Sequence, residues 1–211
     1  MTATVFIIDD DASVRTSLSR LLRSEGIATE SFESAPAYLD RDVHEGVGCI
    51  LLDINMPEMS GIELQSRLVE RGHALPIVFL TGHGDVAISV MAMKRGALDF
   101  LTKPVDREDL VRAVRQALVH HDRVREAAAM RNSVLRQIDS LTPREQDVMQ
   151  QLITGALNKV IADRLDISVK TVKVHRAHIM EKMGVRSAAE LLHLCHLAGI
   201  EPGAGSTPEN G

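Results

Sequence analysis

The feature that most constrains the fold is an unbroken run of small and apolar residues that ends at an acidic one. Residues 48–57 read Gly-Cys-Ile-Leu-Leu-Asp-Ile-Asn-Met-Pro. Because polar and apolar side chains do not alternate in this run, it predicts a strand that is buried on both faces, as in a parallel sheet. Such sheets bind ligands just beyond the carboxyl ends of their strands, where Asp53 stands. A carboxylate there is either buried at a cost in free energy or kept for chemistry.

A second apolar strand, residues 5–8, runs into Asp9, Asp10 and Asp11. If the two strands are neighbours in one parallel sheet, Asp9, Asp10 and Asp53 converge at one edge. Carboxylates this close repel one another by roughly 1 kcal/mol per pair in water, and by more near a protein surface. Bound Mg²⁺ would relieve the repulsion, and one carboxylate could attack a phosphoryl group. The alternative is that these residues cap helices and form turns, which is our interpretation of Asp11.

The first half of the chain alternates strand and helix signals. Strands are expected at residues 5–8, 27–32, 48–53, 76–81 and 98–102. Helices are expected at residues 12–25, 34–40, from Ser60 onward, 85–95 and 107–120. This repeat predicts an α/β fold with a doubly wound parallel sheet and helices on both faces. The Arg/Glu/Ala-rich residues 121–138 are expected to extend the last helix into a helical linker.

Charge divides the chain into two parts. The formal net charge is −5, but residues 1–122 carry 12 Lys/Arg against 19 Asp/Glu, whereas residues 123–211 carry 12 against 10. Within the second part, residues 168–186 hold five basic residues and one acidic residue. An acidic half followed by a locally basic one predicts that the two halves have different functions.

Composition excludes several classes of protein. Four Phe, one Tyr and no Trp argue against an aromatic stacking surface for single-stranded nucleic acid. No apolar run approaches the roughly 18 residues of a membrane span, and the N-terminus lacks the pattern of a signal peptide. Cys49 and Cys195 lie in separate apolar segments and are expected to be core thiols in a reducing compartment. These features predict a cytoplasmic protein.

The second half has no strand signal. Helices are expected at residues 143–154, 158–165, 169–183 and 188–198. Capping-box patterns open at Ser60, Thr142 and Ser187, each with Glu three residues later. The tail, residues 201–211, is rich in Gly and Pro and is expected to be disordered.

The third of these helices has a face that suits the major groove of DNA. At about 100° per residue, Val172, Ile179 and Met183 share an apolar face that would pack on the scaffold. The opposite face suits guanine, phosphate and thymine methyl groups, and it carries Lys170, Lys173, Val174 and Ala177, with Arg176 near its edge. Candidate phosphate contacts are Lys159, Thr171 and Lys182. The alternative is an ordinary solvated helix face.

Three more residues join the predicted acidic pocket. Thr81 and Lys103 each stand at the carboxyl end of a predicted strand, where a hydroxyl and an ammonium could bind phosphoryl oxygens. Asn55 could offer its backbone carbonyl to a metal. Pro104 follows Lys103, so the bond between them could be cis and fix the lysine.

The first 122 residues resemble the receiver domain of bacterial two-component response regulators. The resemblance rests on Asp9-Asp10, Asp53 with Met56-Pro57, Thr81 and Lys103-Pro104. It implies a flavodoxin-like sheet in which Asp53 accepts a phosphoryl group from a histidine kinase. Mg²⁺ would be held by Asp10, Asp53 and the Asn55 carbonyl, with Asp9 acting through water. Thr81 and Lys103 would bind the phosphoryl group, and Phe100 would stand at the aromatic switch position.

The second half resembles the LuxR-type helix-turn-helix. The resemblance rests on Leu141-Thr142-Pro143-Arg144-Glu145, Asn158-Lys159-Val160-Ile161-Ala162 and Thr171-Val172-Lys173-Val174-His175. It implies that Lys173 and Val174 read bases and that the fourth helix dimerises; burial of that helix within the monomer is the alternative. The chain therefore resembles a FixJ/NarL-type regulator with a receiver at 1–122, a linker at 123–138, a four-helix DNA-binding domain at 139–200 and a tail at 201–211.

The expected function is phosphorylation-controlled transcription. Expected partners are a sensor histidine kinase, double-stranded promoter DNA, RNA polymerase and, when phosphorylated, a second copy of the chain. No turnover of a separate substrate is expected. One alternative is a regulator that works without phosphorylation. Another is a Mg²⁺-dependent aspartyl phosphatase, although Asn55 replaces the second Asp such enzymes usually carry. A zinc site at His175, His178, His193 and His196 is not favoured, since no sharp spacing links the two pairs.

Overall fold

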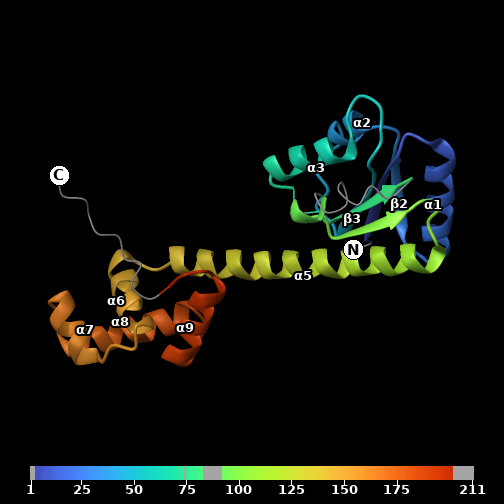
Figure 1. Cartoon of the computed structure of the whole chain (residues 1–211). Coiled ribbons are helices and arrows are strands. Elements are labelled where there is room, and N and C mark those ends of the chain that lie inside the picture. Colours follow the sequence, from blue (N-terminus) through green and yellow to red (C-terminus); the bar gives the residue numbers. More distant parts are fainter. Residues whose placement is uncertain (1–2, 74, 83–91, 202–211) are drawn as a thin grey trace, which may run out of the picture. The chain divides into compact units, whose positions relative to one another are not determined.

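The computed structural model describes residues 3–73, 75–82 and 92–201, and the chain forms two compact units, Met1–Arg125 and Glu126–Gly211. The strands of the first unit are β1 (Thr4–Ile8), β2 (Ala28–Phe32), β3 (Gly48–Asp53), β4 (Ile77–Thr81) and β5 (Asp99–Thr102) (Figure 1). Its helices are α1 (Ala12–Ser24), α2 (Ala35–Leu39), α3 (Gly61–Glu70) and α5, which spans Arg107–Asp139. Most of the helix predicted at 85–95, and nearly all of the predicted disordered tail, lie outside the described residues.

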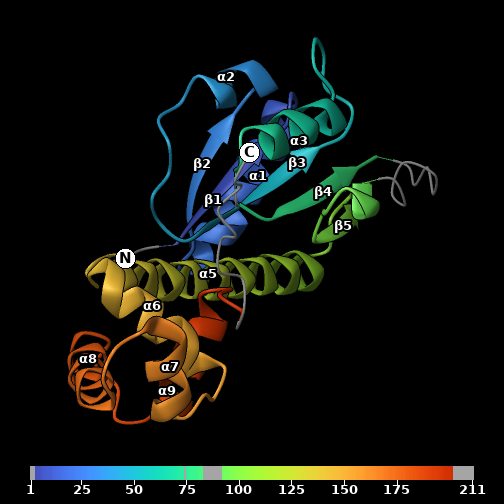
Figure 2. The same cartoon turned by 90° about the vertical axis from the view of Figure 1, so that its left-hand side faces the viewer.

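The five strands form one parallel sheet in the order β2-β1-β3-β4-β5 (Figure 2). The register pairs Ile8 of β1 with Leu52 of β3, so Asp9 and Asp53 come next to each other at the carboxyl edge. Every residue of β3 is buried, as its unbroken apolar run predicted. By contrast β2 lies at the edge of the sheet and is mostly exposed.

Helices cover both faces of the sheet, which confirms the doubly wound fold. On one face α2 and α3 contribute Tyr38 and Leu64 to a core that contains Phe6. On the other face α1 and α5 contribute Leu22 and Val114 to a second core. Each strand residue points to one of these two cores in turn, because successive side chains of a strand point to opposite faces.

Helix α5 joins two segments that the sequence analysis treated separately. The sequence predicted a helix to about residue 120 followed by a helical linker, and the structure shows one helix of 33 residues. No Gly or Pro occurs between Arg107 and Asp139, so nothing in that segment breaks the helix. Its last turns belong to the second unit, where Val134 is buried in the core.

The second unit is all helical, as predicted. Its further helices are α6 (Pro143–Ile153), α7 (Asn158–Leu165), α8 (Val169–Lys182) and α9 (Ala188–Leu197). The observed ends of α6, α8 and α9 differ from the predicted ones by one residue. One apolar cluster joins the unit, with Val148, Ile161, Val172 and Leu191 all fully buried.

Helix caps follow the sequence signals with one exception. Asp11 caps α1 by accepting from the backbone N–H of Ser13 at 2.7 Å. The capping boxes at Ser60 and Thr142 are complete, with each Glu side chain returning to the capping backbone N–H. The box at Ser187 is incomplete, because the Glu190 carboxylate accepts from the N–H of the preceding residue, Arg186, at 2.9 Å.

Candidate functional site: an acidic pocket and a helix-turn-helix

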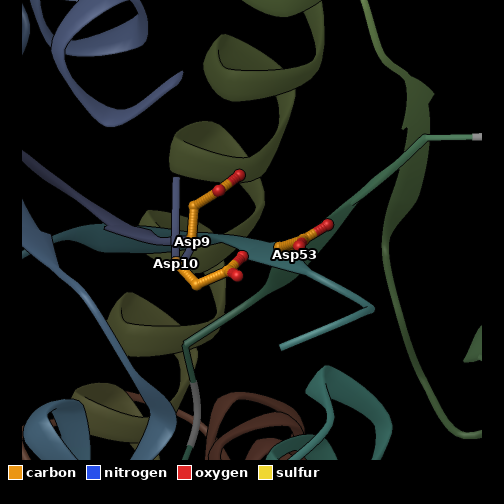
Figure 3. Close-up of side chains that lie close together, drawn as sticks. All are labelled: Asp9, Asp10 and Asp53. Carbon is orange, nitrogen blue, oxygen red and sulfur yellow. The ribbon is translucent and has the colours of Figure 1, made fainter. Parts of the chain in front are cut away.

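Three carboxylates meet at the carboxyl edge of the sheet. Asp9 and Asp10 follow β1 and Asp53 ends β3, and each offers an oxygen within 4.8 Å of the others. Figure 3 shows the three side chains gathered at this edge. Asp9 and Asp53 are buried, whereas Asp10 is exposed. The convergence predicted from the two strand ends is therefore present, because the register places β1 and β3 side by side.

Lys103 connects this pocket to the far strand of the sheet. It directly follows β5, and its Nζ lies 2.6 Å from Asp9 Oδ2 and 3.1 Å from Asp53 Oδ1. Its backbone N–H donates to the carbonyl of Thr81 at 2.6 Å, and the bond to Pro104 is cis. The lysine thus places one cation against two of the three carboxylates.

The charges in the pocket shift the pKa values of its groups. Burial raises the pKa of Asp53, and the hydrogen bond and charge of Lys103 oppose that rise. For Lys103, burial alone would lower the pKa, but the hydrogen bonds to Asp9 and Asp53 outweigh burial and raise it. Lys103 is therefore an ammonium at neutral pH, and Asp53 sits beside a fixed positive charge.

The other predicted pocket residues occupy the same edge of the sheet. Thr81 ends β4 and is buried, and Asn55 is exposed two residues after Asp53. Phe100 lies in β5, half-buried against the core formed with α2 and α3. The chain also packs closely behind Asp53: a Cβ at Gly61 would lie 2.2 Å from the Asp53 carbonyl oxygen, so only glycine fits at the start of α3.

Sequence reasoning missed Arg15, which supports the acidic turn from α1. Its Nη1 donates to the backbone carbonyls of Asp9 at 2.6 Å and Asp10 at 2.9 Å. A basic residue one turn into the helix after an acidic run was the only signal for this contact. Because both bonds go to backbone atoms, Arg15 fixes where the two carboxylates point and leaves their oxygens available for other partners.

If the pocket accepts a phosphoryl group, as the receiver resemblance implies, replacing Arg15 with alanine is expected to slow that reaction about three- to tenfold, because the acidic turn loses two charge-assisted hydrogen bonds. The rate is measured as the gain of phosphoryl mass with time in the presence of Mg²⁺ and a small phosphodonor. Arg20→Ala is the matched control, since Arg20 is exposed on the same helix. Equal rates for the two variants would show that Arg15 does not position the pocket.

Helices α7 and α8 form a helix-turn-helix. Asp166 follows α7 in the left-handed conformation, with φ of 51°, and Ser168 caps α8 by accepting from the N–H of Thr171. The short turn of residues 166–168 suits this conformation, because Asp tolerates positive φ better than most residues. Val172 and Ile179 of α8 are buried against the rest of the unit, as the helical periodicity predicted.

The predicted DNA-facing residues separate into two groups. In the first group the side chains make no hydrogen bond or ion pair with the described residues, and all are exposed on α7 and α8: Lys159, Lys170, Lys173, Val174 and Ala177. The other three are engaged within the unit. Arg176 donates to Asn158 Oδ1 at 3.3 Å, the Thr171 hydroxyl lies 2.8 Å from Ser168 Oγ, and Lys182 Nζ lies 2.6 Å from Glu145 Oε2.

Glu145 is a buried structural carboxylate. It closes the capping box of α6, pairs with Lys182, and lies 3.5 Å from His178 Nδ1. The hydrogen bonds from Lys182 and from the Thr142 backbone lower the pKa of Glu145 to about 2. Lys182 therefore connects α8 to the start of α6, whether or not it also contacts a DNA phosphate.

Glu145→Gln is expected to destabilise the second unit by about 1–2 kcal/mol at pH 7, because the amide keeps the shape and loses the charge attraction. Since folding lowers the pKa of Glu145, its contribution is complete above the usual value of 4.5 and falls as the pH drops towards 2. Hydrogen exchange of peptides from α6 and α8 should show a difference from the native chain that shrinks below pH 4.5. Glu181→Gln, at an exposed site on α8, is the control; a difference independent of pH would contradict this account.

Helix α9 buries one side and exposes the other. Leu191 and Cys195 are fully buried, while Leu192 and Leu197 are 38% and 44% exposed. Part of its apolar surface is thus buried within the monomer, and part is exposed. Among the described residues, Asp9, Asp10 and Asp53 form the only group of His, Cys, Asp and Glu side chains close enough to share a metal, so the zinc hypothesis gains no support.

Two family models match this chain, one in each half. Residues 5–115 match the model of the response regulator receiver domain, and residues 139–195 match that of the luxR family of bacterial regulatory proteins. Within the described residues no helix is long and apolar enough to cross a membrane.

Relatives and solved structures cover nearly the whole chain. The response regulator protein TmoT of Ectopseudomonas mendocina is 44% identical over 90% of this chain and 86% of its own length. The transcriptional regulatory protein FixJ of Azorhizobium caulinodans is 43% identical over 97% of each chain. The structure of the response regulator StyR matches with a TM-score of 0.83 and 46% identity, over 93% of this chain and 99% of that one. The chain belongs to the FixJ-type two-component response regulators, which combine a receiver domain with a LuxR-type DNA-binding domain.

Proposed function

We propose that Asp53 is the residue that accepts a phosphoryl group from a sensor histidine kinase. The observation that carries this proposal is the placement of Asp53, buried at the end of β3 with two carboxylates within 4.8 Å and an ammonium at 3.1 Å. An Asp53 oxygen attacks the phosphorus atom, a phosphorus–oxygen bond forms, and the bond to the histidine nitrogen of the kinase breaks. That nitrogen leaves with the bonding electron pair and is neutralised by a proton.

The donor set of the pocket fits Mg²⁺. Three carboxylates that supply only oxygen suit a small hard cation, and we propose Asp9, Asp10, Asp53 and the Asn55 carbonyl as the residues that hold it. Bound Mg²⁺ would neutralise charge shared by the carboxylates and the phosphoryl oxygens. Lys103 already lies beside Asp53 and would bind one phosphoryl oxygen, and the Thr81 hydroxyl would bind another.

We further propose that phosphorylation changes the assembly of the chain. The phosphoryl group adds about −1.5 to −2 charges at Asp53, which draws Thr81 and Lys103 towards it and biases the face that carries Phe100. Phosphorylated receivers would then dimerise and place two copies of α8 in major grooves about 34 Å apart. In this scheme residues 1–122 receive the signal, 123–138 link, and 139–200 bind DNA.

The DNA contacts follow from exposure and chemistry. Lys173 and Val174 would read base edges, and Lys170 and Ala177 lie on the same face. Lys159, Thr171, Arg176 and Lys182 would contact phosphates or support the contact surface. The proposed partners are the kinase, double-stranded promoter DNA and RNA polymerase. The proposed location is the cytoplasm, where the promoter DNA lies. We propose no turnover of a separate substrate.

A mass measurement tests the phosphoryl transfer. The full chain is incubated with acetyl phosphate as the small phosphodonor, with Mg²⁺ or with EDTA, and its intact mass is recorded. The expected result is one added phosphoryl group with Mg²⁺ and none with EDTA. Phosphorylation that proceeds equally in EDTA would contradict the proposed metal dependence, and no phosphorylation under either condition would contradict the acceptor role of Asp53 towards small donors.

A further inference from the structure

A basic cavity lies at the edge of the sheet opposite to Asp53. Its volume is about 470 Å³, and its charged or titratable lining residues are His44, Glu45, Arg71, His73, His121 and Arg125. The first two precede β3, the next two follow α3, and the last two lie on the part of α5 that belongs to the first unit. Three segments that are distant in sequence therefore converge on one cavity, which we name the basic cavity.

The charges of the basic cavity are poorly balanced. Arg71 and Arg125 make no ion pair with any residue that the structure describes, whereas Arg107 and Arg115 on the same unit share Glu25. The single carboxylate of the lining, Glu45, is exposed. The exposed Arg71 and the half-buried Arg125 thus line a cavity whose one lining carboxylate is solvated, which favours the binding of an anion.

The buried histidine of the cavity, His121, is held in the tautomer that carries its proton on Nε2. His121 is 4% exposed, and its Nδ1 accepts from the backbone N–H of Gly48 at 3.0 Å. This bond requires an unprotonated Nδ1, so the neutral ring carries its proton on Nε2. Burial and the charge of Arg125 lower the pKa of His121, which favours this neutral form. The ring therefore adds one N–H donor to the two guanidinium groups.

We propose that the basic cavity binds a small polyanion, a molecule that carries phosphate groups or several carboxylates. Arg71 and Arg125 would pair with its oxygens, and His121 Nε2–H would donate to it. The volume falls in the range of about 300–1,000 Å³ typical of small-molecule sites. Such a ligand would link α5 to the segments before β3 and β4, and it would act apart from the phosphorylation pocket.

Calorimetric titration of the full chain tests the proposal, with pyrophosphate and citrate as the two probes, in a chelator-free buffer from which divalent cations have been removed by a chelating resin. The expected result is saturable binding of one probe per chain; tighter pyrophosphate indicates a phosphate-bearing ligand, and tighter citrate indicates a polycarboxylate. Arg71→Gln and Arg125→Gln are each expected to weaken binding about tenfold through loss of a charged pair. Arg67→Gln removes the same charge from an exposed site on α3 and is expected to change little.

Three outcomes would overturn the proposal. The first is that neither probe binds saturably at millimolar concentration. The second is that Arg71→Gln and Arg67→Gln bind equally well. The third is that binding survives in the Arg71→Gln/Arg125→Gln double variant but is lost in Lys173→Ala, which would assign the anion to the DNA-binding unit.

Discussion

Replacing Asp53 with asparagine is expected to abolish every response of the chain to a phosphodonor. The amide has no carboxylate oxygen to attack phosphorus, and it removes one of the three charges that would hold Mg²⁺. Donor-dependent gain of phosphoryl mass, and the donor-dependent increase in promoter affinity, should both disappear. Intact mass and a DNA mobility assay on the full chain measure these two effects.

Asp11→Asn is the matched control for this variant. Asp11 is two residues from the pocket carboxylate Asp9, but its side chain caps α1, and asparagine caps helices equally well. The control should therefore respond to the donor much as the native chain does. Full phosphorylation of Asp53→Asn would show that another residue is the acceptor. Loss of the response in both variants would indicate that the substitutions disturb the structure at the carboxyl edge of the sheet.

Lys173→Ala is expected to weaken binding of the chain to its specific DNA about 10- to 100-fold, because a base contact is worth about 1–3 kcal/mol. Lys173 is exposed on α8 and makes no ion pair within the described structure, so its charge is available to DNA. The probe is a DNA fragment that the native chain selects from a random-sequence pool. Lys159→Ala, at an exposed proposed phosphate contact, should instead weaken binding to all sequences and reduce the salt slope by about one charge.

Arg136→Ala controls for the loss of a basic residue outside the helix-turn-helix. Arg136 is exposed near the end of α5, and its removal changes the net charge by the same amount. Affinity losses of equal size for Lys173→Ala and Arg136→Ala would mean that only total charge matters. An unchanged sequence preference in Lys173→Ala would remove that residue from the base-reading set.

The fold was predictable from local patterns because its signals are strong. The apolar run into Asp53 identified the central strand, and turn residues between such runs marked the rest. The end of α5 was less predictable, because residues 107–139 hold no Gly or Pro to separate helix from linker. The complete capping box predicted at Ser187 was also wrong. The Glu190 carboxylate accepts from the backbone N–H of Arg186, one residue before the cap.

The acidic pocket was predictable as a set, while its supporting contacts were not. Strand ends in a parallel sheet bring Asp9, Asp53 and Lys103 to one edge without any knowledge of side-chain positions. The hydrogen bond from the Gly48 N–H to His121 Nδ1 joins residues 73 apart in sequence, and no local sequence pattern predicts it. Lys182 was predicted as a candidate phosphate contact of the third helix, but its ion pair with Glu145 depends on how α6 packs on α8.

The most direct test of the central claim is the molar mass of the full chain in solution, measured by light scattering with and without Mg²⁺ and beryllofluoride. Beryllofluoride mimics an acyl phosphate on Asp53 and requires the same cation. We expect the molar mass to shift from that of a monomer to that of a dimer only when Mg²⁺ and beryllofluoride are both present. No shift is expected for Asp53→Asn. A mass that does not change, or that changes equally in Asp53→Asn, would contradict control of assembly by the acidic pocket.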